Sequence, residues 1–201
     1  MGGNKAIIHL DPVDTIVQVN GGSRTTIVGA PDESAAARIA LDLIGDGVEL
    51  IELCGGFGPL AGATVIEAVN GRVPVGSVLF GMESLTTVAD YKARAESGER
   101  MTGAFIYIQE GADPVVDRVV REHAGGRTTF VAVPDGSAAP GVAAELVARG
   151  DAQLIELYGG FTPVSAAKVI EAVKTGIPVG VVGYGPEFLA TPAARPSPVS
   201  R

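Results

Sequence analysis

The chain has 201 residues, of which 46 % are hydrophobic, and its mean hydropathy is +0.31. This length and composition exclude a disordered chain and are sufficient for one large or two small domains. Acidic residues outnumber basic ones by 23 to 15, and the net charge of −8 argues against a nucleic acid as partner.

Short apolar runs rich in β-branched residues alternate with helical patterns along the chain. In the first half, the patterns predict strands at 6–10, 25–29, 49–54 and 73–80, helices at 33–43 and 59–69, and a weaker helix at 11–20. A helix at 85–96 leads into the second half, where strands are expected at 104–109, 128–133, 153–158 and 177–184 and helices at 113–123, 138–148 and 163–173. Asp113 suits the N-cap and Pro114 the first turn of their helix, and Asp32 and Ser137 suit helix N-caps.

The two halves are copies of one another. Residues 48–76 and 152–180 align at a constant offset of 104, and 17 of these 29 positions are identical. We therefore expect a first α/β repeat at 4–84, a linker with a helix at 85–101, a second repeat at 102–188 and a disordered tail at 189–201. Proline residues 186, 192, 196 and 198 favour the disordered tail.

Nearly continuous apolar strands indicate a parallel sheet that is covered on both faces. The pattern βαβαβαβ, present twice, predicts two tandem doubly wound parallel-sheet modules of the α/β class, packed as a pseudo-dimer within one chain. Each module alone is close to the lower size limit for independent stability, which favours this pairing. The alternative is a compact (βα)8 barrel made of two half-barrels, and a further homodimer also stays open.

The segments ELIELCGGFGP (49–59), VIEAV (65–69) and VPVG (73–76), with their second copies, resemble a family of short bacterial proteins classed as a domain of unknown function. The resemblance covers both copies. It implies a common fold unit and a pairing of units, because members of the family usually carry a single copy. It implies no reaction and no catalytic residue.

Two glutamates are the leading catalytic candidates. Glu52 and Glu156 lie late in the third predicted strand of each copy, among leucine and isoleucine residues. Burial in such a strand would raise the pKa of either carboxyl group into the range that suits a general acid or base. His9, at the end of the first strand, is a third catalytic candidate. The alternative is that both glutamates are structural and bind backbone N–H groups or pair across the two copies.

A glycine-rich turn follows each glutamate and leads into a helix. The turns are expected to help bind a substrate, because free N–H groups at a helix start can hold a carboxylate or phosphate. The candidate binding residues are Gly55, Gly56 and Phe57 in the first copy and Gly159, Gly160 and Phe161 in the second. The alternative is a tight turn whose phenylalanine fills the core.

Positions that differ between the copies are further candidates for substrate contact. Cys54 corresponds to Tyr158, and Asp11 follows the first strand close to His9. A cysteine near a histidine is compatible with a nucleophile, but a single cysteine in an apolar strand is also a common core residue.

These observations predict a small-molecule enzyme of the lyase, isomerase or cyclase type that works by acid–base catalysis. The alternative is a non-catalytic ligand-binding or assembly module. No cofactor is expected, and two histidines with one cysteine do not make an ordinary zinc site, although a carboxylate-rich Mg²⁺ site stays open. One cysteine and no apolar run near the roughly 18 residues of a membrane span predict a cytoplasmic protein without a membrane partner.

Overall fold

The computed structural model describes residues 3–10, 14–174, 176–186 and 188. The first repeat contains β1 (Asn4–His9), β2 (Ile16–Asn20), β3 (Ser23–Gly29), α1 (Glu33–Gly45), β4 (Leu50–Leu53), α2 (Gly58–Val69) and β5 (Val75–Phe80). The short helix η1 (Met82–Ser84) and α3 (Leu85–Glu96) follow. The second repeat contains β6 (Met101–Ile108), β7 (Arg118–His123), β8 (Gly126–Val133), α4 (Ala139–Ala148), β9 (Leu154–Tyr158), α5 (Pro163–Val173) and β10 (Val179–Tyr184). Both repeats have the same order of elements, while the expected tail at 189–201 lies outside the described residues.

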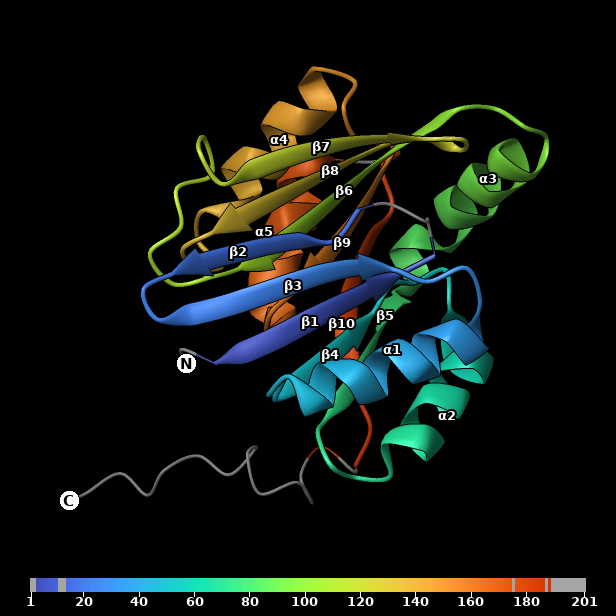
Figure 1. Ribbon diagram of the computed structural model, residues 1–201. Helices are drawn as coiled ribbons and strands as arrows, with labels where there is room; N and C mark the ends of the chain where they lie inside the picture. The colour runs from blue at the N-terminus through green and yellow to red at the C-terminus, as the bar shows by residue number, and fades with distance from the viewer. Residues whose placement is uncertain (1–2, 11–13, 175, 187, 189–201) are drawn as a thin grey trace.

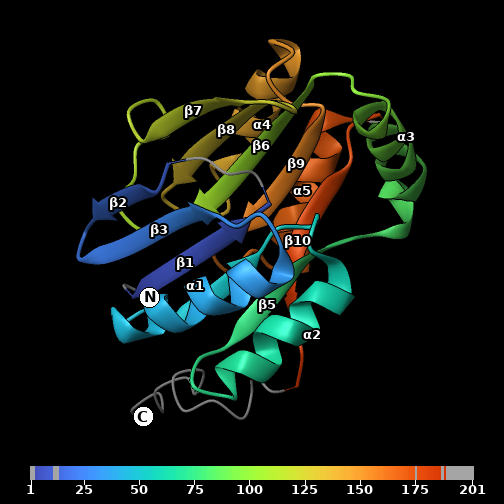
Figure 2. The ribbon, with the colours of Figure 1, turned by 45° about the vertical axis from the view of Figure 1, so that its right-hand side comes forward.

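The described strands form one ten-stranded sheet in the order β2-β3-β1-β4-β5-β10-β9-β6-β8-β7. The order of the first half is reversed in the second, so an approximate twofold axis passes between β5 and β10. These two strands are antiparallel, as are the edge pairs β2–β3 and β7–β8, while the other neighbours are parallel. The sheet curls so that its two halves face each other and the long helices lie on the outside (Figures 1 and 2).

This arrangement confirms an α/β fold built from two tandem repeats that pair within one chain. A (βα)8 barrel is excluded, because its strands would all be parallel whereas β5 and β10 are antiparallel. In each half the two helices pack against each other on one face of the sheet. The second helical layer of a doubly wound module is absent from the described residues, and the other repeat covers that face instead.

The predicted helix at 113–123 is wrong. A single turn, in which the Asp117 N–H donates to the Asp113 carbonyl over 2.7 Å, leads there into the antiparallel edge strand β7. Exposure alternates along β7 from Val119 to His123, which is the period of a strand with one face on the core. The equivalent β2 replaces the weaker helix expected at 11–20, of which residues 11–13 lie outside the described part.

One of the three predicted helix caps is confirmed, and that of Asp113 fails together with its helix. Asp32 caps α1, since its Oδ1 accepts the Ala35 N–H over 2.7 Å. Ser137 is not the N-cap of α4, which follows Ala138 without a side-chain cap. Ser137 donates to Asp135 instead, because the chain makes an additional turn before the helix begins.

Inward-facing side chains of both repeats form one common layer of the core. The ring of Phe105 lies 5.2 Å from that of Phe130 and 5.1 Å from that of Tyr158, centroid to centroid. His9 of the first repeat packs against the same phenylalanine rings. Because the inner layer is shared, neither repeat would have a complete core by itself.

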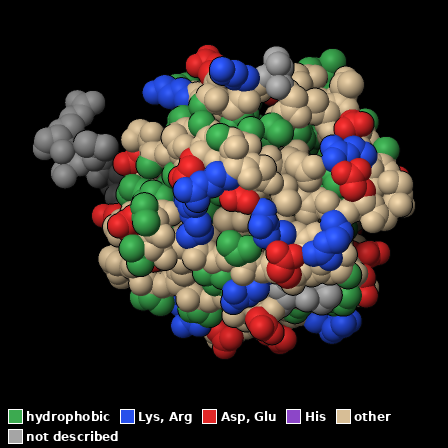
Figure 3. Space-filling view, turned by 90° about the horizontal axis from the view of Figure 1, so that it is seen from above, with side chains coloured by type: hydrophobic (Ala, Val, Ile, Leu, Met, Phe, Trp, Pro, Cys, Tyr) green, Lys and Arg blue, Asp and Glu red, His purple; other side chains and the backbone are tan. Residues whose placement is uncertain are grey.

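Charges of both signs are mixed on one face of the molecule. On the face seen in Figure 3, lysine and arginine side chains lie beside aspartate and glutamate side chains. Oppositely charged side chains also form surface ion pairs, such as that of Arg100 with Glu122, with an N–O distance of 2.7 Å. No helix of the described residues is both long enough and apolar enough to cross a membrane.

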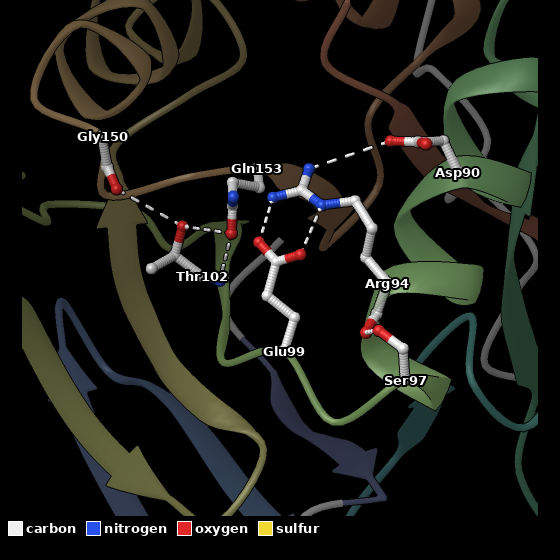
Figure 4. Close-up of polar contacts among 7 residues, drawn as sticks. All are labelled: Asp90, Arg94, Ser97, Glu99, Thr102, Gly150 and Gln153. Atoms are coloured by element: carbon white, nitrogen blue, oxygen red, sulfur yellow. Dashed lines mark hydrogen bonds and ion pairs between the residues drawn. The ribbon is translucent and has the colours of Figure 1, made fainter.

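The two repeats are joined through α3 and the segment that follows it. Arg94 on α3 pairs with Glu99 and lies 3.8 Å from Asp90 (Figure 4). At the start of β6, the Thr102 N–H donates to the Gln153 side-chain oxygen over 2.8 Å (Figure 4). No residue of α3 is buried, so the contact between the repeats is made by the sheet and its inner layer rather than by this helix.

Candidate functional site

The two candidate glutamates face the inner layer between the repeats. In β4 and β9 the neighbouring leucine and isoleucine side chains point to the outer helices, and the alternation of a strand therefore turns the glutamates inward. Glu52 is 0 % exposed and Glu156 is 4 % exposed. Neither carboxylate is therefore in contact with bulk water.

Each glutamate binds the glycine turn of the other repeat. The Gly159 N–H donates to both carboxylate oxygens of Glu52, over 2.9 and 3.0 Å. The Gly55 N–H donates to Glu156 Oε1 over 3.1 Å. We call these four residues the glutamate clasp. Hydrogen bonds of the clasp therefore cross the interface between the repeats in both directions. This arrangement matches the alternative in which the glutamates are structural and pair across the two copies.

One tyrosine hydroxyl completes each end of the clasp. Tyr184 donates to Glu52 Oε1 over 2.7 Å, and Tyr158 donates to Glu156 Oε2. Both tyrosines belong to the second repeat, whereas the equivalent positions of the first repeat hold Phe80 and Cys54. The two ends of the clasp are therefore chemically similar but are built from positions that are not equivalent.

The clasp requires glycine at both turns. At Gly55, a Cβ atom would lie 2.8 Å from Glu156 Oε1, which is too close for a real contact. At Gly159 the backbone has φ +86°, and a Cβ would lie 2.7 Å from Lys5 Nζ. The second glycine of each turn has another role. A Cβ at Gly56 would clash with Leu10, whereas Gly160 has free space around it and is favoured by its backbone conformation, φ +92°.

Burial dominates the electrostatics of the clasp. It raises the pKa of Glu52, although the nearby charge of Lys5 opposes this shift. Burial also raises the pKa of Glu156 from 4.5 to about 7, although the hydrogen bonds from Tyr158 and Gly55 lower it. Lys5, whose Nζ donates to the Ile108 carbonyl, has its own pKa lowered by burial. A carboxyl group with a pKa near 7 can hold or release a proton under neutral conditions.

The raised pKa of Glu156 predicts a specific dependence of stability on pH. The folded state binds this proton more tightly than the unfolded state, so the stabilisation is complete below about pH 4.5 and is lost as the pH rises through about 7. We expect urea unfolding between pH 5 and 8 to show a declining free energy of unfolding. Glu156→Gln should reduce this decline, while Glu67→Gln, an exposed control on α2, should not. An unchanged decline in Glu156→Gln would contradict the assignment.

His9 is not among the hydrogen-bond partners of the clasp. It is 1 % exposed, and its ring lies 5.8 Å from Phe105 and 5.5 Å from Phe130. Within the described residues neither ring nitrogen has a hydrogen-bond partner. Burial lowers its pKa to about 4, so the ring is neutral near pH 7.

The remaining candidates lie in or near the core. Cys54 is buried, and burial raises the pKa of its thiol, which disfavours the reactive thiolate. Phe57 and Phe161 are buried beside their turns, as expected for a tight turn whose phenylalanine fills the core. Asp11 lies outside the described residues.

A groove of about 550 Å³ lies on the outer side of the first repeat, and the sequence reasoning missed it. It runs between the outer face of β2 and β3 and the end of α1. Its lining consists of polar residues and short apolar ones: Asn4, Thr15, Val17, Arg24, Thr26, Val28, Leu43, Asp46 and Val48. Another groove, of about 440 Å³, lies beside α5 and β10. Neither glutamate of the clasp lines either groove.

The same place in the second repeat is spanned by ion pairs. Arg118 and Arg127 occupy the strand positions that correspond to Thr15 and Arg24. Arg118 reaches across to Glu145 on α4, with an N–O distance of 3.0 Å, and Arg127 pairs with Asp151. Divergence between the copies was the signal that could have revealed this difference, but it becomes readable only when the strands are aligned in space.

The fold and the paired glycine turns define a tandemly duplicated α/β protein. The profile described as "Family of unknown function (DUF6506)" matches residues 9–93 and again 101–194. The chain therefore belongs to this family and contains two copies of its domain, as the sequence resemblance implied. A comparison with curated proteins gave no match.

Three of the matching solved structures are distantly similar to this chain. A carbohydrate transporter from Acidothermus cellulolyticus 11B in complex with myo-inositol is 15 % identical, with 90 % of this chain and 74 % of that chain covered and a TM-score of 0.30. An NtrC family transcriptional regulator from Clostridium acetobutylicum is 12 % identical, with coverages of 94 % and 92 % and a TM-score of 0.32. An ABC transporter solute-binding protein with bound L-rhamnose, from Clostridium phytofermentas, is 13 % identical, with coverages of 96 % and 79 % and a TM-score of 0.32. Likeness at this level carries no argument about the function of this chain.

Proposed function

We propose that the protein is a small-molecule-binding module and that its ligand binds in the groove of the first repeat. One observation carries the proposal: this groove is open, whereas the equivalent place in the second repeat is spanned by two ion pairs. A volume of about 550 Å³ lies within the usual range for small-molecule sites. Its lining combines four apolar residues with five polar or charged ones, and polar groups of this kind fix the orientation of a bound ligand.

In this proposal the glutamate clasp holds the two repeats together and does not take part in chemistry. The N–H groups of Gly55 and Gly159, which could otherwise hold a substrate oxygen, already donate to the protein's own carboxylates. Both glutamates are also buried by the inner layer. A substrate would have to separate the repeats before it could reach these groups.

A second candidate function is acid–base catalysis of the lyase, isomerase or cyclase type. The pKa of Glu156, raised to about 7, favours it, because a group of this kind suits proton transfer near neutral pH. In this alternative Glu156 would exchange a proton with a substrate and Tyr158 would hold the carboxylate in place.

Thermal unfolding in the presence of ligands, followed by a turnover assay of each ligand that binds, distinguishes the two functions. The protein would be screened against carboxylic acids, phosphates, acyl thioesters and neutral polyols. A ligand at 100 times its dissociation constant should stabilise the fold by about 2.7 kcal/mol. Binding that survives in Glu156→Gln and turns over no substrate supports the module. Turnover that is lost in Glu156→Gln, in a variant that remains folded, would support the enzyme.

The variant Thr15→Arg tests whether the groove is the binding site. Arginine at this position imitates Arg118 and should extend toward Asp42, as Arg118 does toward Glu145. We expect stabilisation by the ligand to disappear while the melting temperature without ligand stays within a few degrees. Leu60→Arg, at an 89 % exposed position on α2, is the control and should bind normally. A Thr15→Arg protein that still binds the ligand would place the site elsewhere.

A further inference from the structure

Arg24 is the basic group of the open groove, and its charge is not neutralised by an ion pair within the described part of the chain. It lies on the outer face of β3, opposite Asn4 of β1 and Val19 of β2. Asp46 also lines the groove but forms no ion pair with it. The Asn4 Nδ2 donates to the Asp46 carbonyl over 3.4 Å, so this end of the groove is polar.

The second repeat shows what an arginine at this position binds. Arg127, its equivalent, pairs with the carboxylate of Asp151. Asp151 lies in a loop that is one residue longer than its counterpart. The loops can be compared from their turn glycines, Gly47 at φ +84° and Gly150 at φ +74°. In the first repeat one residue separates Gly47 from Glu49, whose N–H donates to the Asn4 carbonyl of β1. In the second repeat two residues separate Gly150 from Gln153, whose N–H donates to the Thr102 carbonyl of β6. The carboxylate that neutralises Arg127 therefore has no counterpart in the first repeat.

The other end of the groove is apolar. Val17, Val28 and Leu43 line it and are only partly buried or exposed, so they can contact a ligand. A ligand that satisfied both ends would carry an anionic group at one end and a hydrocarbon body at the other. An arginine guanidinium matches a carboxylate with two parallel hydrogen bonds.

We propose that the first repeat binds a small organic acid, whose carboxylate takes the place that Asp151 occupies in the second repeat and whose apolar body lies against Val17, Val28 and Leu43. This inference rests on the proposed binding function and adds the chemical class of the ligand. The acid pairs with Arg24. Because Arg24 is exposed, this ion pair is weakened by added salt.

Titration of the ¹⁵N-labelled full chain tests the inference with three probes of equal chain length: hexanoate, hexyl phosphate and hexanamide. Hexanoate is expected to shift amide signals of β3 and the end of α1. Arg24→Gln should weaken its binding about three- to tenfold, since one exposed ion pair is removed. Arg127→Gln is the matched control and should leave the affinity unchanged, because its charge is already paired within the protein.

Each outcome separates the ligand class from the binding function. Hexanamide that binds as tightly as hexanoate, or equal affinity in Arg24→Gln, would overturn the organic-acid assignment but leave the binding function in place. Preference for hexyl phosphate would assign a phosphate head group instead of a carboxylate. If none of the three probes binds, the ligand class is wrong. If the wider thermal screen is also silent, the proposed function fails with it.

Discussion

Glu52→Ala is expected to lower the free energy of unfolding by about 3–5 kcal/mol, because it leaves two buried hydrogen-bond donors unpaired at about 1–3 kcal/mol each. The substitution leaves the N–H of Gly159 and the hydroxyl of Tyr184 without their acceptor in a buried place. It also removes the charge that faces Lys5. Urea unfolding monitored by circular dichroism would measure the loss.

Two further variants define the origin of that loss. Glu52→Gln keeps an acceptor oxygen for Gly159 and Tyr184, and we expect a smaller loss than in Glu52→Ala. Glu67→Ala, which removes an exposed glutamate of α2, should change stability by less than about 0.5 kcal/mol. Wild-type stability of Glu52→Ala would show that the clasp does not hold the repeats together.

Gly159→Ala is expected to cost about 3 kcal/mol, because two independent effects add. The residue has φ +86°, a conformation that costs an alanine roughly 1–2 kcal/mol. Its new Cβ would also lie 2.7 Å from Lys5 Nζ and 2.9 Å from the Ile108 carbonyl oxygen, so the turn would move away from Glu52. The expected result is a less stable protein with a looser contact between the repeats.

Gly160→Ala separates these two effects. Gly160 has a similar φ of +92°, but nothing lies within 4 Å of the place where its Cβ would be. We therefore expect it to cost only the conformational part, roughly 1–2 kcal/mol. Chemical denaturation of both variants under identical conditions gives the comparison. Equal losses at the two positions would mean that the close approach of the turn to its neighbours has no energetic consequence.

The sequence allowed the parallel strands and most helices to be predicted because their apolar periods are strong. It failed at the edge strands β2 and β7. The segment that ends at His123 reads Val-Val-Arg-Glu-His, which is too short to separate a helical period from an alternating one. The two-residue Gly21–Gly22 connection between β2 and β3 was a usable hairpin signal, and it outweighs the weak helical pattern in front of it.

The candidate site was predictable only in part. Burial of Glu52 and Glu156 follows from their apolar neighbours in the strand. Their actual partners are 107 and 101 residues away along the chain, and only the antiparallel joining of β5 and β10 brings these segments together. The groove was harder still to predict, because it depends on two differences between the repeats. Thr15 stands where the second repeat has Arg118, and the shorter loop of the first repeat has no counterpart of Asp151.

The unequal distribution of tyrosines in the clasp has a consequence for stoichiometry. By the approximate twofold symmetry, two copies of the second repeat would offer two hydroxyl groups to each glutamate, one from a Tyr158 position and one from a Tyr184 position. Two copies of the first repeat would offer none, because Cys54 and Phe80 stand there. Covalent fusion of unlike copies fixes one hydroxyl for each carboxylate, a ratio that no symmetric dimer of either repeat alone can reach.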